Sequence, residues 1–192
     1  MRRVGKEQSA TRARILDAAQ ALMVEEGYAA VSARRVASQA GIKPALVQYY
    51  FPTMDDLFLA VYRRAAQHST DRQMAALHSE RPLDALWEFT GDTSTAVLAV
   101  EFMALANHRK AIRAEIARHV EQSRAMQAEA LARLTAEGKA DPVAFPLAGI
   151  LTLLAVSARG LVMEQSLGAT IGHEDAHGIV ERWLAGIAGA KP

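Results

Sequence analysis

The stretch that decides the fold is residues 31–57, VSARRVASQAGIKPALVQYYFPTMDDL. Ser32 can accept a backbone N–H at the start of a short helix, with Val31 outside it as a hydrophobic staple. Gly41 can adopt the left-handed conformation that ends a helix, and Pro44 fits the first position of the next one. The stretch therefore predicts a helix-turn-helix: two short helices joined by a tight turn, followed by the start of a further helix.

The second short helix, about residues 44–50, carries side chains suited to reading DNA. In a helix-turn-helix, this helix can enter the major groove. Gln48 can pair with adenine, Tyr49 can reach a phosphate or a base edge, and Ala45 allows close approach to a thymine methyl. Lys43 also faces outward, whereas the residues that pack the helix down are expected among Leu46, Val47, Tyr50 and Phe51. The alternative is an ordinary helical hairpin with a polar exposed face.

Residues 10–57 resemble the N-terminal DNA-binding domain of the TetR family of transcriptional regulators. The resemblance rests on the order and spacing of Ile15, Leu16, Ala18, Ala19, Gly27, Tyr28, Val36, Ala37, Ala40, Gly41 and the run Tyr49, Tyr50 and Phe51. It implies an all-α homodimer that binds a palindromic operator and is usually released by a small molecule. Two residues depart from the family pattern. Lys43 stands where the family often has Ser or Thr, and Met54 stands where it often has a lysine that contacts phosphate.

The composition favours a helical protein without disulfides. Half of the 192 residues are apolar and only 6% are aromatic, as expected of a helical bundle. The absence of cysteine excludes disulfides and thiolate metal sites and fits a cytoplasmic location. Arg2, Arg3 and Lys6 are followed by no apolar segment, so no signal peptide is expected.

The near-neutral net charge hides an asymmetry along the chain. Residues 1–52 carry eight lysines and arginines against four aspartates and glutamates, a balance of +4, whereas the rest carries fourteen against seventeen, a balance of −3. Basic residues therefore gather where the helix-turn-helix is predicted, as in a module that binds phosphates. Arg34 and Thr53 are expected to hold the DNA backbone there. A merely soluble basic tail would explain only part of this excess.

Helical periodicity and breakers divide the chain into a predicted DNA-binding domain, 1–52, and a helical effector-binding and dimerisation domain, 53–192. Thr53 and Asp56 form a pair typical of a capping box at the start of the latter. The apolar run Val143–Ala158 is shorter than the ~18–20 residues of a membrane span and ends at Arg159, so a helix buried on nearly all sides and continuing to about Leu167 is expected. The other helices are expected at about 10–26, 54–78, 83–90, 92–107, 109–137 and 173–188.

Apolar side chains in segment 60–167 are candidates to line an effector pocket, since methionine and aromatic residues suit an adaptable cavity. For any single one of them, core packing is the alternative. Glu101 and Arg159 are polar exceptions that could orient a ligand or pair with another charge, and such charges are normally paired when buried. The predicted ligand-binding set is Trp87, Phe89, Leu98, Glu101, Phe102, Met103, Met126, Leu151, Leu154, Arg159 and Met163.

The last two helices are expected to pair with a second copy, because helices that are apolar all round must be covered and two-fold homodimers are the commonest oligomers. Internal core is the alternative. The predicted dimerisation residues are Leu147, Ile150, Leu154, Ile179, Trp183, Leu184 and Ile187.

No catalytic motif is recognisable, so an enzyme is not expected, and neither is a cofactor. His173 and His177 stand at i and i+4, but two histidines without a third ligand do not predict a metal site. The predicted function is a DNA-binding transcriptional regulator, most simply a homodimeric repressor released from a palindromic operator by a small hydrophobic ligand. The alternative is a helical small-molecule carrier whose helix-turn-helix does not read DNA, which Met54 favours.

Overall fold

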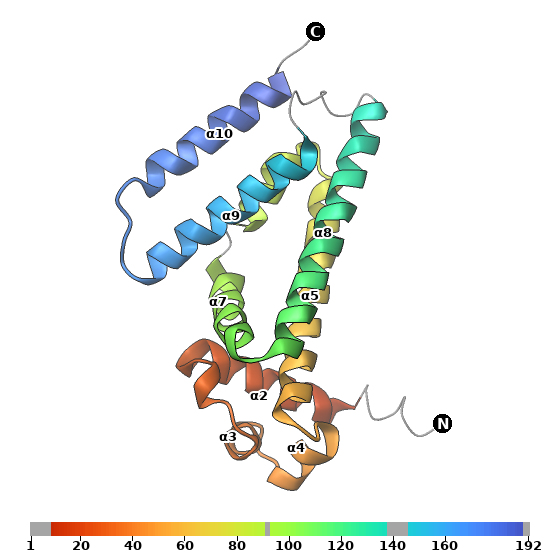
Figure 1. Ribbon diagram of the computed structural model, residues 1–192, viewed down its shortest axis with the longest axis vertical. Helices are drawn as coiled ribbons and strands as arrows, with labels where there is room; N and C mark the ends of the chain where they lie inside the picture. Colours follow the sequence, from red (N-terminus) through yellow and green to blue (C-terminus); the bar gives the residue numbers. More distant parts are fainter. Residues whose placement is uncertain (1–8, 91–92, 138–145, 190–192) are drawn as a thin grey trace. The chain divides into compact units, whose positions relative to one another are not determined.

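The computed structural model describes residues 9–90, 93–137 and 146–189, and in these ranges the chain is helical with no strand (Figure 1). The predicted all-α class is confirmed, and the predicted bounds 10–26 and 44–50 are those observed. In chain order the elements are α2 (Ala10–Glu26), the single 3₁₀ turn η1 (Tyr28–Ala30), α3 (Ala33–Gln39), α4 (Pro44–Tyr50), α5 (Met54–Leu77), α6 (Pro82–Thr90), α7 (Thr93–His108), α8 (Lys110–Ala136), α9 (Leu147–Ser166) and α10 (His173–Gly189).

The helix-turn-helix forms by the local signals in its sequence. The Ser32 hydroxyl accepts the N–H of Arg35 at 3.3 Å and so caps α3. Gly41 has φ +62° in the turn, and Pro44 occupies the first turn of α4. The guanidinium of Arg14 donates to the carbonyl oxygen of Ala40, which satisfies an acceptor at the end of α3.

Contacts divide the described chain into two compact units, and the division differs from the predicted boundary at 52/53. The first unit contains the residues up to Gln67 together with Val97–Ala117, and so adds most of α7 and the start of α8 to the helix-turn-helix. The reason is apolar burial, because side chains of α7 and α8 share one core with α2, α3, α4 and α5. That core includes Ile15, Leu16, Leu22, Met23, Val36, Val47, Leu57, Phe58, Leu98, Phe102, Leu105 and Ile112.

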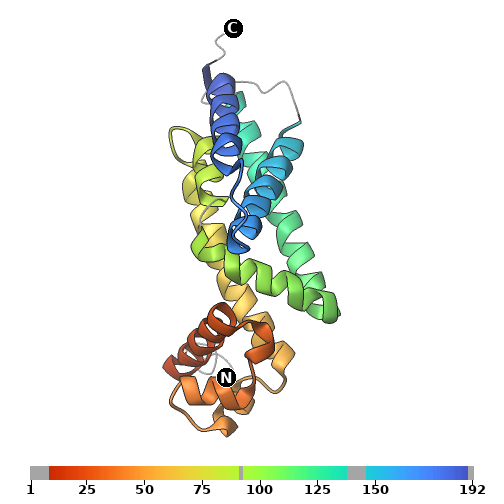
Figure 2. The ribbon, with the colours of Figure 1, turned by 90° about the vertical axis from the view of Figure 1, so that its left-hand side faces the viewer.

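The second unit contains the remaining described residues, from His68 to Ala96 and from Arg118 onward. In it α6 packs against α9 and α10, and α10 returns alongside α9 in the opposite direction (Figures 1 and 2). Trp87 of α6, 4% exposed, is the largest residue of their common core, which also holds Ile150, Leu154, Ala158 and Leu184.

The structure corrects the two expectations for the apolar run at 143–158, of which residues 143–145 lie outside the described part. Its helix, α9, is 20 residues long and ends at Ser166, close to the expected end at about Leu167. By length and composition it could cross a membrane, with a mean hydropathy of 1.6, and only 28% of that apolar window is buried. It is not covered on all sides, because Leu153 and Val156 are 68% and 54% exposed.

Replacing Gly41 with alanine is expected to lower the free energy of unfolding by about 1 kcal/mol, because an L side chain is strained at this positive φ. Asparagine adopts this conformation more readily, so Gly41→Asn should lose less. Urea denaturation of both variants measures the difference. An alanine variant as stable as the parent would contradict the strained turn.

Candidate nucleic-acid interface

The outer face of α4 is exposed, while one residue anchors the helix from beneath. Val47 is 1% exposed in the shared core, whereas Tyr49 is 60% exposed. The other predicted contact residues on or beside this helix are also exposed, namely Arg34, Lys43, Ala45, Gln48 and Thr53. The structure differs at Leu46, expected among the packing residues, which is 40% exposed. The anchoring of α4 therefore comes from Val47 with Phe51 and the partly buried Tyr50.

A series of side-chain contacts connects the exposed ring of Tyr49 to the start of α2. Its ring meets the edge of Tyr50, with centroids 5.3 Å apart and an interplanar angle of 83°. The phenol oxygen of Tyr50 accepts a hydrogen bond from the Ser9 hydroxyl at 2.8 Å. The same Ser9 oxygen accepts the N–H of Arg12 at 3.1 Å and caps α2. Sequence analysis missed this role of Ser9 and Tyr50, although a serine directly before a helix is a recognisable cap signal.

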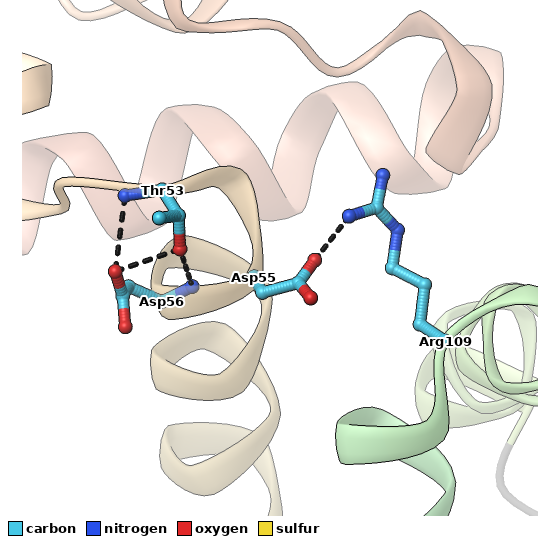
Figure 3. Close-up of polar contacts among 4 residues, drawn as sticks. All are labelled: Thr53, Asp55, Asp56 and Arg109. Carbon is cyan, nitrogen blue, oxygen red and sulfur yellow. Dashed lines mark hydrogen bonds and ion pairs between the residues drawn. The ribbon is translucent and has the colours of Figure 1, made fainter.

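At the end of α4, Thr53 and Asp56 form the predicted capping box at the start of α5 (Figure 3). The Asp56 carboxylate accepts the N–H and the hydroxyl of Thr53 at 3.0 and 2.7 Å, and the Thr53 hydroxyl accepts the N–H of Asp56 at 3.1 Å. The box fixes the backbone between the two helices. A contact from the Thr53 hydroxyl to a DNA phosphate, which stays a prediction, therefore has to replace the bond it donates here.

Some basic side chains of the first compact unit make contacts that stabilise that unit. Arg35 pairs with Glu26, and this hydrogen bond lowers the pKa of Glu26 and raises that of Arg35. The stabilisation from this exposed pair is therefore present at neutral pH and is lost as the pH falls through the lowered pKa of Glu26. The guanidinium of Arg12 lies over the Phe51 ring, 5.3 Å from its centroid. Arg12 and Arg35 thus have interaction partners within their own unit.

The residues predicted to line an effector pocket do not form one cluster. Leu98 and Phe102 belong to the core that the helix-turn-helix shares with α7 and α8. Trp87 and Leu154 lie in the core formed by α6, α9 and α10. Leu151 belongs to a third cluster, which contains Leu77. Met103 and Met163 are 45% and 39% exposed. Met126 and Arg159 are half-buried on α8 and α9. Residue type alone does not distinguish a side chain of the core from one that lines a cavity.

Glu101 has a hydrogen-bond partner within the first compact unit, and its contact with a ligand stays a prediction. Its carboxylate oxygen accepts the backbone N–H of Tyr28 at 2.6 Å, the first N–H of η1 after Gly27, which has φ +84°. A backbone donor at the start of a helix has no partner within that helix, so an acid from another element satisfies it. Glu101 therefore joins α7 to the turn that follows α2.

The second unit contains one groove and one polar cluster that bear on ligand binding. A groove of about 480 Å³ is lined by Arg72, Ala75, Ala76, Ala85, Glu88 and Phe89, so it contains only Phe89 of the predicted set. Gln73 and Ser123, both 9% exposed, are the buried polar side chains of the described ranges. Gln127 donates to the Gln73 amide oxygen at 2.6 Å, and Gln73 donates to Ser69 at 2.9 Å. The polar i, i+4 pairs on both helices were a signal that sequence analysis did not use.

The two histidines considered for a metal point to different partners. The Nε2 of His173 lies 3.0 Å from a Glu164 oxygen, and the His177 ring packs against Trp87. Among the residues that the structure describes, no group of three or more potential metal ligands comes together.

In its described ranges the chain is all-α, and its helix-turn-helix exposes the outer face of the second helix. Residues 15–61 match the family model for "Bacterial regulatory proteins, tetR family". The HTH-type transcriptional regulator CymR of Pseudomonas putida is 28% identical over 122 residues, 59% of this chain. The match spans 60% of CymR, less than two thirds of its length.

Solved structures share the fold over nearly the whole chain. A TetR transcription regulator from Haloarcula marismortui has a TM-score of 0.74 at 19% identity, covering 92% of this chain and 97% of its own. A Saccharomonospora viridis protein in complex with choline has a TM-score of 0.74 at 24% identity, covering 88% and 94%. Residues 15–61 therefore match the tetR family of bacterial regulatory proteins, and the solved structures show that nearly the whole chain has the same fold as these proteins.

Replacing Glu101 with alanine is expected to lower the free energy of unfolding by about 1–3 kcal/mol, because the Tyr28 N–H loses its acceptor. Glu101→Gln retains an amide oxygen at this position and should lose less. Urea denaturation of both variants tests this role. A fully stable alanine variant, or equal losses in the two, would contradict it.

Proposed function

We propose that this protein is a sequence-specific DNA-binding transcriptional regulator, a repressor released from a palindromic operator by a small molecule. The observation that carries the proposal is the outer face of α4, which exposes Gln48 and Tyr49 above the buried Val47. A helix held from beneath and polar outside is what insertion into a major groove requires. The excess of basic residues before position 53 supplies the attraction to phosphates.

In this proposal the residues of the face have separate tasks. Gln48 reads a base edge, and Tyr49 contacts a base or a phosphate beside it. Lys43, at the start of α4, and Arg34, on α3, hold the DNA backbone. Ala45 leaves room for the helix to approach the groove floor. Two such helices in a two-fold dimer would lie about 34–36 Å apart, one turn of DNA.

The proposed dimer is supported by apolar side chains exposed on α9 and α10. Leu153, Val156, Met163 and Ile179 are 68%, 54%, 39% and 59% exposed. Of the residues predicted for the interface, Ile150, Leu154 and Leu184 are instead buried in the chain's own core, and the side chain of Ile187 lies outside the described part. Leu147 and Trp183 are half-buried. The proposal thus keeps the two helices and Ile179 but moves the α9 face to Leu153 and Val156.

The effector is proposed to bind in the helical second unit. The buried cluster of Gln73, Ser123 and Gln127 provides amide and hydroxyl groups between α5 and α8, so an effector reaching it has to offer hydrogen bonds. The proposed effector is therefore an apolar molecule with a polar end, rather than a hydrocarbon alone. Reciprocity requires that operator DNA weaken effector binding by the factor with which the effector weakens DNA binding.

The alternative function is a small-molecule carrier that does not read DNA. It is favoured by Met54, which stands where the family often has a lysine. A carrier should bind DNA fragments weakly and with little dependence on salt. A regulator should show a steep negative slope of log affinity against log salt and prefer its site by ~10³-fold or more.

Selection of bound fragments from random duplex DNA tests the function, and the proposal predicts a two-fold symmetric site. Tyr49→Ala should weaken binding to that site by about tenfold or more, as expected for one lost specific contact, with unchanged thermal unfolding. Val24→Ala is the matched control, because Val24 is also exposed and apolar but lies on α2. No enrichment of any sequence, or equal affinity of the Tyr49 variant, would contradict the proposal.

Introducing a charge on the α9 face tests the dimer. Leu153→Glu should convert the dimer into a monomer, because an uncompensated carboxylate in an apolar interface costs several kcal/mol. Ala132→Glu, on an exposed position of α8, places the same charge elsewhere. Sedimentation equilibrium of both variants gives the mass in solution. A Leu153 variant that remains dimeric would exclude this face.

A further inference from the structure

Arg109, at the junction of α7 and α8, pairs with a carboxylate beside the proposed DNA-binding face (Figure 3). Its guanidinium donates to Asp55 in the first turn of α5. The same guanidinium lies over the Phe58 ring, 5.6 Å from its centroid. Both contacts lie within the first compact unit.

The junction that carries Arg109 is held by hydrogen bonds of its own. Arg113, one turn into α8, donates from Nε to the carbonyl of Ala106 at 3.1 Å and from Nη2 to that of Asn107 at 3.2 Å. These carbonyls are at the end of α7, where acceptors lack partners within the helix. Arg109 therefore contacts Asp55 from a turn whose backbone is held by the hydrogen bonds of Arg113.

Asp55 is unfavourably placed for a protein that binds DNA. It lies two residues after Thr53 and next in sequence to Asp56, and its carboxylate points toward Arg109, away from the Asp56 carboxylate that the capping box occupies (Figure 3). The side chains of Asp55 and Arg109 are 41% and 38% exposed, so the electrostatic potential of the Asp55 carboxylate extends into the surrounding solvent.

We propose that Arg109 is a positioning residue for DNA binding, because it compensates the charge of Asp55 and holds the first turn of α5 under the DNA-binding face. This inference rests on the proposed function. It assigns a role in binding to a residue far outside the segment 15–61 that matches the family model. Any displacement of the α7–α8 junction that breaks the pair leaves a negative charge facing the phosphates, which weakens binding without moving α4.

A double-mutant cycle measured on a duplex recovered from the selection tests this role. Arg109→Gln should weaken binding about five- to tenfold, as expected when one charge near several phosphates is no longer compensated. Asp55→Asn should bind as well as the parent or better. Asp55→Asn combined with Arg109→Gln should return to within about twofold of the parent, since the rescue reports coupling between the two residues.

The salt dependence separates this role from a direct phosphate contact. If Arg109 itself contacted a phosphate, Arg109→Gln would reduce the slope of log affinity against log salt by about one. If it acts on Asp55, the slope should fall by less than one, because the repulsion from Asp55 is only screened by salt, and adding Asp55→Asn should restore the parental slope. Arg63→Gln is the matched control, because Arg63 on α5 pairs with Glu115 on α8 in the same unit, at 2.8 Å, and should change binding by less than about twofold.

Four results would overturn the inference: parental affinity for Arg109→Gln, a salt slope lowered by about one that Asp55→Asn does not restore, a double variant as weak as Arg109→Gln, or weaker binding by Asp55→Asn. Arg109→Lys keeps the charge and should retain affinity within about threefold, so it tests the role even if the glutamine variant fails to fold. Failure of the parent protein to bind any selected duplex would instead refute the proposed function.

Discussion

The apolar core beneath α4 is the constraint on which the rest of the structure depends. Val47 and Phe51 bury the inner side of the helix-turn-helix against Ile15 and the start of α5, and Phe102 of α7 closes the same core. Because one side of α4 is committed to this core, its other side must face solvent. The seven-residue α4 is thus held in place by burial, because so short a helix is not stable alone.

Polar contacts fix the relative positions of the helices that share this core. Apolar packing is non-directional, whereas a hydrogen bond to one particular N–H or carbonyl fixes the position of the element that makes it. Glu101 fixes α7 to the N–H of Tyr28, Arg14 fixes α2 to the end of α3, and Arg109 joins the start of α8 to α5. These bonds make α7 and the start of α8 part of the unit that displays α4.

The local structure was predictable from the sequence, because its determinants are local. Ser32, Gly41, Pro44 and the Thr53 capping box each act over a few residues, and each has the predicted role. Tertiary pairing was not predictable in this way. No spacing indicates that Glu101 meets Tyr28, 73 residues away. In α9, apolar residues occur on every side of the helix. The helical periodicity of the sequence therefore does not distinguish the buried Leu154 from the exposed Leu153.

The central claim is that the outer face of α4 is the surface that meets DNA. Amide hydrogen exchange with and without a duplex recovered by selection tests it most directly, since exchange reports which backbone segments become protected. Binding should slow exchange in residues 43–53 and leave the middle of α10 unchanged. Protection confined to other helices, with residues 43–53 exchanging as in the free protein, would contradict the claim.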